Sequence, residues 1–320
     1  MKKRRRLKKS VYVVFIGLII LIIALSSLNN YIKLINSNEY KLEKLGYTKD
    51  EVNTILKLDE KNIEDVLSKD KAYKIIPKLI KKDYFMYKNL DRYIDYHNNH
   101  HDDSLDKVIS IVNVGADHEW YDEKFIKDAD QTQGTLILIN KFNHIDKKYT
   151  PKNIIAISNQ YAYGNNSITE EAFKNFKEMF YAAKKEDLTL IITSSYRDYE
   201  TQDKLWNQYS NAYGDEYADS VSARAGYSEH QSGYALDIVT YNSVMNDFEE
   251  TDEFKWLQKH AHEYGFILRY PKGKEYLTGY DYESWHYRYV GKDAAKSIKE
   301  KGITFDEYYA YYIEGDKWKK

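Results

Sequence analysis

The chain of 320 residues begins with seven basic residues and one long apolar segment, and this arrangement limits how the remainder can fold. Residues 10–28 form an almost uninterrupted apolar run, within the about 17 to 25 residues that a membrane-spanning helix needs. The basic flank at residues 1–9 predicts a cytoplasmic leader by the positive-inside rule. Everything after Leu28 is therefore expected to fold in water on the outer side of the cell membrane, behind a single spanning helix.

A cleaved signal peptide is the competing interpretation of the same segment. Ala24, Leu25 and Ser26 resemble a small-residue cleavage site. We favour an uncleaved signal-anchor, because the apolar run exceeds the about 7 to 15 residues of a signal-peptide core. Both interpretations export the rest of the chain.

The charge and cysteine content of the exported part narrows its function class. Without the seven basic residues of the leader, it has 41 Lys and Arg against 50 Asp and Glu, a formal net charge of −9. This argues against nucleic acid as a partner, because phosphate binding depends on clustered Lys and Arg. The chain has no cysteine, which excludes a disulfide scaffold and thiol catalysis.

Residues 29–105 are predicted to form a helical stalk or subdomain. They are rich in Lys and Glu, contain few glycines and space their apolar residues as helices do. Thr48 and Glu51 are placed as a capping box at the start of one such helix. The polar cluster at residues 97–103 (His-Asn-Asn-His-His-Asp-Asp) could hold a surface metal ion, but we interpret it as a solvated linker because no periodicity orients its side chains.

Residues 106–320 show short β-like runs that alternate with helices, which indicates one globular domain. An amphipathic helix opens at residues 167–170. Its apolar residues, most of them aromatic, recur at helical spacing from Phe173 to Ala183, as expected of core positions. Further helices are predicted at residues 199–209 and 254–264. Strands are predicted at residues 108–114, 135–139, 188–193, 235–239, 266–270 and 285–290.

His230 and Asp237 are two possible metal ligands separated by six residues. A fully extended chain would place them about 23 Å apart, so a bend is required if they are to meet. Gly233 lies between them and permits such a bend. Taken singly, each residue is better explained as a capping histidine or a strand-end carboxylate.

The segment Glu283-Ser284-Trp285-His286 offers a second imidazole and a second carboxylate. Three protein ligands with an open fourth position, and a carboxylate outside the ligand set, are the parts of a zinc hydrolase. Glu283 and His286 would face opposite sides of a regular strand and come together only in a turn or kink. Trp285 is expected to pack in the core beside the site.

Four separate blocks of sequence, together with two shorter segments at the start, resemble the VanY-type zinc D-alanyl-D-alanine carboxypeptidases and their LdcB-like L,D-carboxypeptidase relatives. The resemblance covers about residues 113–290 and implies the α+β fold of Hedgehog and DD-peptidase-like zinc peptidases, a small antiparallel sheet flanked by helices. The blocks are residues 194–202, 226–237, 265–271 and 283–286, preceded by Leu138-Ile139-Asn140-Lys141 and Tyr149-Thr150-Pro151.

The resemblance also implies a role for individual residues. His230, Asp237 and His286 match the ligands of a Zn²⁺ ion, and Glu283 matches the general base. Arg197 matches the arginine that binds the terminal carboxylate of the substrate, a task suited to its planar guanidinium. The remaining matches line the substrate pocket, and they are Gln202, Ser228 and Tyr270.

Some of these positions have plainer interpretations. Arg197 could be an exposed turn residue, although its place after a predicted buried strand favours a site at the strand end. Tyr270 could be a packing aromatic in a chain with 33 tyrosines, and Gln202 and Ser228 could bond the backbone. Ala225 departs from the family, which often has proline there. This difference affects none of the residues with an implied chemical role.

The function that follows from the resemblance is zinc-dependent removal of the C-terminal D-alanine from peptidoglycan stem peptides. An L,D-carboxypeptidase acting on tetrapeptide stems and an endopeptidase are alternatives within the same reaction class. A cell-wall-binding module without catalysis is the alternative from another class, although such proteins usually lack a ligand or the base. A structural zinc site is disfavoured because four Cys or His ligands typically close it, and other divalent ions would also suit this ligand set.

Overall fold

A computed structural model of the chain describes residues 9–241, 243 and 245–315. The chain divides between Asn98 and Asn99 into two compact units. The predicted cytoplasmic leader, residues 1–9, lies outside the described residues except for Lys9.

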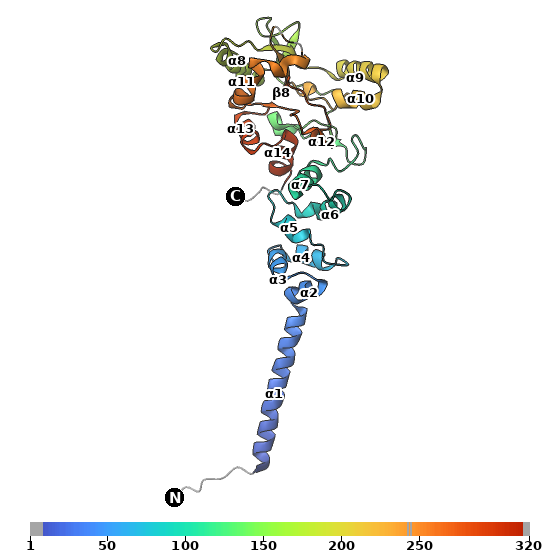
Figure 1. The fold of residues 1–320 in the computed structure, drawn as a ribbon, viewed down its shortest axis with the longest axis vertical. Helices are drawn as coiled ribbons and strands as arrows, with labels where there is room; N and C mark the ends of the chain where they lie inside the picture. The colour runs from blue at the N-terminus through green and yellow to red at the C-terminus, as the bar shows by residue number, and fades with distance from the viewer. Residues whose placement is uncertain (1–8, 242, 244, 316–320) are drawn as a thin grey trace. The chain divides into compact units, whose positions relative to one another are not determined.

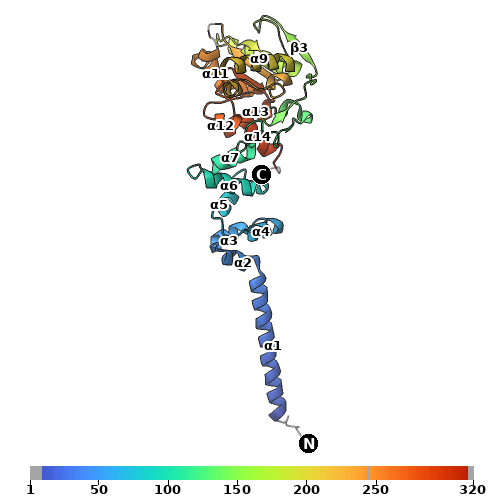
Figure 2. The same ribbon diagram turned by 90° about the vertical axis from the view of Figure 1, so that its right-hand side faces the viewer.

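The first unit begins with α1 (Lys9–Asn36), which is one continuous helix (Figure 2). Residues 11–36 are long and apolar enough to span a membrane. Apolar side chains are exposed along the helix, including Val13 and Phe15, which are 70% and 65% exposed. The predicted spanning segment lies within this helix.

Short capped helices make up the rest of the first unit. Ser37, Thr48 and Asp59 act as N-caps, each accepting a hydrogen bond from a backbone N–H three residues later. The predicted capping box is confirmed, since Glu51 also accepts from the Thr48 backbone N–H. The helices are α2 (Asn38–Leu45), α3 (Lys49–Ile55), α4 (Glu60–Leu67), α5 (Ile76–Ile80) and α6 (Leu90–Asn99).

A four-stranded antiparallel sheet is the centre of the second unit. Its strand order is β5 (Ile191–Ser194), β6 (Ala235–Val239), β8 (His286–Tyr289) and β7 (Phe266–Leu268). Two smaller sheets pair β1 (Lys127–Asp128) with β2 (Asn143–His144) and β3 (Ile154–Ile157) with β4 (Asn166–Thr169). The α+β class and the small antiparallel sheet are therefore confirmed.

One face of the central sheet is covered by α8 (Glu170–Lys184) and α11 (Asp252–His260), both labelled beside β8 in Figure 1. Leu236 and Ile238 of β6 point to this face, as does Tyr287 of β8. Phe176 of α8 is fully buried against them, as the helical spacing of its aromatic residues predicted. Because this face of the sheet is buried, the pairing register of the strands is strongly specified.

The opposite face of the sheet carries the polar residues of β6 and β8. A second apolar cluster lies at its edge, formed by α13 (Lys292–Lys301), α14 (Phe305–Tyr312) and parts of β7. Phe305 of α14 is fully buried there. The other elements of the unit are α7 (Leu105–Val114), η2 (Gln131–Leu136), α9 (Tyr199–Tyr213), α10 (Asp215–Val221), η3 (Glu229–Ser232), η4 (Met245–Glu250), η5 (Ala261–Tyr264) and α12 (Glu275–Thr278).

The remaining secondary-structure predictions for this unit have mixed outcomes. Helices 199–209 and 254–264 are confirmed, as α9 and as α11 with η5. Strands form within residues 235–239, 266–270 and 285–290, and the strand predicted at 188–193 begins later and ends one residue beyond, as β5. The strand predicted at residues 108–114 is wrong. This segment belongs to α7, because Ser104 caps it, Gly115 ends it, and its buried residues follow helical spacing.

Two further predictions are corrected by the structure. Residues 135–139 form no strand, since they begin in the 3-10 turn η2 and continue as irregular backbone in which Ile137, Leu138 and Ile139 are all buried. The irregular linker predicted at residues 97–103 is wrong for its first three residues, which complete α6. The composition of an apolar, β-branched run does not by itself distinguish a strand from buried irregular backbone.

The turn at Gly233 generates a stability prediction. Gly233 has φ +72°, and a Cβ there would lie 2.9 Å from Pro151 Cγ and 3.1 Å from Thr169 Cγ2. Gly273 has φ +80° with nothing within 4 Å, so it is a matched control for the backbone cost. We expect Gly273→Ala to cost about 1 to 2 kcal/mol for the left-handed conformation, and Gly233→Ala to cost a further 1 to 3 kcal/mol for overpacking.

The measurement is thermal unfolding of the full chain in detergent, which should show a lower midpoint for Gly233→Ala than for Gly273→Ala. Equal midpoints for the two variants would contradict the packing constraint.

Candidate active site and metal centre

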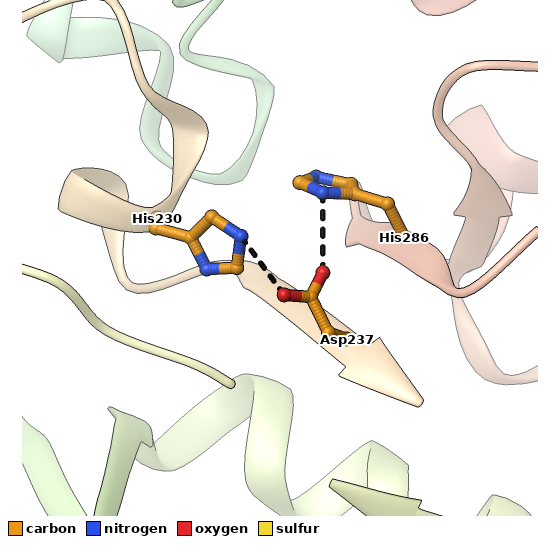
Figure 3. Close-up of side chains that lie close together, drawn as sticks. All are labelled: His230, Asp237 and His286. Carbon is orange, nitrogen blue, oxygen red and sulfur yellow. Dashed lines mark ion pairs between the residues drawn. The ribbon is translucent and has the colours of Figure 1, made fainter. Parts of the chain in front are cut away.

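Asp237 and His286 face each other across the central sheet. They are directly paired in the antiparallel register of β6 and β8. Because side chains alternate along a strand, both lie on the face opposite Leu236 and Tyr287. The Asp237 carboxylate Oδ1 lies 3.3 Å from His286 Nδ1 (Figure 3).

His230 reaches the same point from outside the sheet. It belongs to the 3-10 turn η3, and Gly233 ends that turn in the left-handed conformation before β6 begins. His230 Nδ1 lies 2.6 Å from the Ser195 carbonyl oxygen, so Nδ1 carries the proton and Nε2 presents a lone pair. Nε2 lies 3.5 Å from Asp237 Oδ2 (Figure 3). The predicted bend is confirmed.

These three side chains fit a tetrahedral metal ion. They offer one ligand atom each, all within 4.8 Å of one another. Within the described part of the chain, no other group of three His, Cys, Asp or Glu residues meets the same test. The donor set of two imidazoles and one carboxylate fits Zn²⁺.

The electrostatics of the site also favour a cation. Burial would raise the pKa of Asp237, but the two facing imidazoles outweigh it and hold that pKa well below its usual range. Burial lowers the pKa of His230, which keeps it neutral and able to ligate. Burial opposes charge on His286, yet the surrounding carboxylates raise its pKa. The carboxylates are those of Asp237, Glu229 and Glu283, so negative charge converges on one buried imidazole.

Glu283 lies beside the three candidate ligands. It precedes β8 in an irregular segment, where its backbone N–H donates to the Tyr270 carbonyl oxygen at 3.1 Å. Its Oε2 lies 3.3 Å from His286 Nδ1, so the chain turns before His286 and brings the two side chains together. The side chain is 13% exposed, and burial raises its pKa. A carboxylate with a raised pKa is a stronger base toward water.

Arg197 follows β5 and precedes α9 on the other side of the site. Its guanidinium donates to Gln202 Oε1 at 2.7 Å and to Ser194 Oγ at 2.8 Å. Gln202 is buried, and its amide donates in turn to the Ser222 hydroxyl and the Ala223 carbonyl oxygen. Two of the five guanidinium N–H groups are thus used to fix the orientation of the side chain.

A cavity of about 170 Å³ joins these groups. All eight site residues predicted from the sequence line it, including Ser228 and Tyr270. Tyr270 packs its ring 4.9 Å from the rings of both His286 and Tyr280. Trp285 lines the cavity and also packs against the main apolar core, as expected.

Glu229 is the residue of this site that sequence analysis missed. Its side chain is fully buried and ion-paired with Arg269 and Arg288. Its place directly before His230 was a signal, as were two arginines in segments expected to be strands. Neither feature of the sequence predicts that the side chains of Glu229, Arg269 and Arg288 are in contact.

Comparison with known proteins gives consistent results. The family model "VanY: D-alanyl-D-alanine carboxypeptidase" matches residues 165–292. YodJ of Bacillus subtilis is 38% identical over 187 residues, which cover 55% of this chain and 67% of YodJ. A D-alanyl-D-alanine carboxypeptidase of Enterococcus faecium is 37% identical over 201 residues, which cover 60% of this chain and 63% of that protein.

A solved structure is also similar to this chain. The LdcB LD-carboxypeptidase superposes with a TM-score of 0.55 at 35% sequence identity, covering 60% of this chain and 92% of that chain. The similarity to the two curated relatives thus spans about two thirds of their length and 55% to 60% of this chain.

Proposed function

The chain belongs to the VanY family of D-alanyl-D-alanine carboxypeptidases, and from this premise we propose that it removes the C-terminal D-alanine from peptidoglycan stem peptides. The observation that carries the proposal is the convergence of a metal-binding triad, a spare carboxylate and a guanidinium in one cavity. The enzyme class is metallo-carboxypeptidase, and the donor set fits zinc.

The proposed mechanism assigns a task to each of these residues. A zinc ion held by His230, Asp237 and His286 would polarise the scissile carbonyl and lower the pKa of water. Glu283 accepts a proton from the attacking water while the water oxygen bonds to the carbonyl carbon. As the peptide C–N bond breaks, Glu283 returns that proton to the leaving nitrogen of D-alanine.

Arg197 determines which bond is cleaved. A guanidinium fixed by Gln202 and Ser194 is suited to bind a carboxylate through paired hydrogen bonds. The substrate must then end close to the scissile bond, which favours an exopeptidase over an endopeptidase. Gln202 supports the arginine, while Ser228 and Tyr270 line the walls that contact the peptide.

An L,D-carboxypeptidase is the second candidate, because the similar solved structure is an LD-carboxypeptidase. The two activities differ in the configuration of the residue before the scissile bond and in stem length. Arg197 and the metal-binding triad would serve both. A non-catalytic wall-binding module is disfavoured by the presence of all three candidate ligands and Glu283.

We further propose the arrangement of the chain in the cell. The helix of residues 10–28 would anchor it in the cell membrane, with residues 1–9 in the cytoplasm and the stalk of residues 29–105 outside. The catalytic domain of residues 106–320 would then lie beside its substrate. The mass of the chain purified from membranes distinguishes the anchor from a signal peptide cleaved near Ser26.

The activity is tested with the full chain in detergent and defined stem peptides of three, four and five residues. We expect D-alanine from the pentapeptide, measured by chromatography of the products. Release of D-alanine from the tetrapeptide alone would instead support the L,D-carboxypeptidase. Release from none of the three peptides would refute both carboxypeptidase proposals.

Glu283→Gln should separate metal binding from turnover. We expect activity to fall by about 10²- to 10⁴-fold, because the water loses its proton acceptor, while zinc content stays at one ion per chain. His286→Ala is the control, since it removes a ligand and should lower both zinc content and activity. Zinc analysis with D-alanine release measures the two effects. Activity of Glu283→Gln near that of the wild type would contradict the role of Glu283.

Arg197→Met should weaken recognition of the substrate carboxylate alone. Losing hydrogen bonds to a charged group costs about 1.5 to 3 kcal/mol, so we expect kcat/KM for the pentapeptide to fall by about 10- to 100-fold. The matched control is the same peptide with a C-terminal amide, on which wild type and variant should be equally slow. If the variant loses the same factor on both peptides, Arg197 does not bind the carboxylate.

A further inference from the structure

A buried network of four charged side chains lies directly behind the metal-binding triad. Glu229 Oε1 accepts hydrogen bonds from Arg269 Nε at 2.8 Å and from Arg288 Nη1 at 2.9 Å. Arg269 also forms a two-pronged pair with Asp306, at the start of α14, at 2.5 and 3.1 Å. All four side chains are at most 2% exposed.

The second oxygen of Glu229 points away from the arginines. Glu229 Oε2 lies 3.7 Å from His286 Nε2. Both atoms are buried, and neither has a hydrogen-bond partner among the described residues. Buried polar atoms normally have a hydrogen-bond partner. Here a carboxylate oxygen and an imidazole nitrogen without partners face each other next to the candidate metal site.

The orientation of the His286 ring determines which of its two nitrogens faces the metal position. Its Nδ1 faces Asp237 and Glu283, each at 3.3 Å, so Nδ1 is the atom directed at the metal position. Neutral imidazole carries its proton on one nitrogen only. His286 can ligate through Nδ1 only when the proton is on Nε2, and Glu229 Oε2 is an acceptor placed for that proton.

We propose that Glu229 is a positioning residue that holds His286 in the tautomer with its proton on Nε2, leaving the Nδ1 lone pair for the metal ion. The inference rests on the proposed metal site and extends it to a residue outside the ligand set. Carboxylates that accept from the far nitrogen of a ligating histidine orient the ring and increase its basicity.

The arginines make Glu229 suited to this role. Its Oε1 accepts hydrogen bonds from two guanidinium groups, those of Arg269 and Arg288, which supply the counter-charge of an ionised carboxylate. Arg288 is itself fixed by the carbonyl oxygens of Thr135 and Ile137, each at 2.8 Å. Glu229 is thus an ionised acceptor that cannot turn away from His286 without breaking bonds to both arginines.

Glu229→Gln tests the proposal by reversing the polarity of the contact. Both arginines require an acceptor, so the amide oxygen should face them and the amide NH₂ should face His286 Nε2. That arrangement favours the tautomer with the proton on Nδ1, which cannot ligate. We expect zinc to bind about 10- to 100-fold more weakly, measured by competition with a chelator on the full chain in detergent.

Asp306→Asn is the matched control. It removes the other carboxylate of the same buried network but does not approach His286 directly. It should destabilise the fold, as Glu229→Gln does, and leave zinc affinity within about threefold of wild type. Equal loss of zinc affinity in the two variants would overturn the proposal, as would wild-type affinity in Glu229→Gln.

A measurement on the wild type does not depend on folding of the variants. ¹⁵N spectra of the histidine-labelled, zinc-loaded full chain should show His286 protonated on Nε2 and metal-bound through Nδ1. The opposite assignment would overturn the positioning role even if the protein releases D-alanine. A wild type that binds no zinc would refute the proposed metal mechanism instead, so the two failures are distinguishable.

Discussion

The antiparallel pairing of β6 with β8 is the constraint on which the site depends. It places Asp237 directly opposite His286, and paired side chains on one face of a sheet lie about 4.5 to 5.5 Å apart at Cβ. A slip of one residue would turn one of the two side chains into the apolar core. The burial of Leu236, Ile238 and Tyr287 beneath α8 and α11 prevents that slip. The apolar core therefore determines how these two candidate ligands face each other.

The same alternation has a second consequence on the polar face. Arg288 follows His286 by two residues, so it lies on the same side of β8 and is fully buried there. A buried guanidinium needs a counter-charge, which Glu229 supplies, and hydrogen-bond acceptors, which include the backbone carbonyls of Thr135 and Ile137. Buried ion pairs add little net stability compared with apolar packing. The contribution of this network is therefore greater to the geometry of the site than to the stability of the fold.

The parts of the fold that could be predicted from the sequence are those with local signals. The capping box at Thr48 and the aromatic spacing of α8 specify helices through neighbouring residues alone. Residues 108–114 show the limit, because their β-branched composition favours a strand while the cap at Ser104 and tertiary burial produce a helix. Residues 135–139 are determined by distant partners, including the Arg288 side chain that binds their carbonyl oxygens.

The site residues were identified from motif resemblance, whereas their mutual support required the structure. Gln202 was expected to line the pocket, and the structure shows that it also holds Arg197 in place. Its amide is anchored by Ser222 and Ala223, at the start of the segment that leads to His230 in η3. One stretch of chain thus supports the proposed carboxylate-binding group at one end and carries the candidate metal ligand His230 at the other.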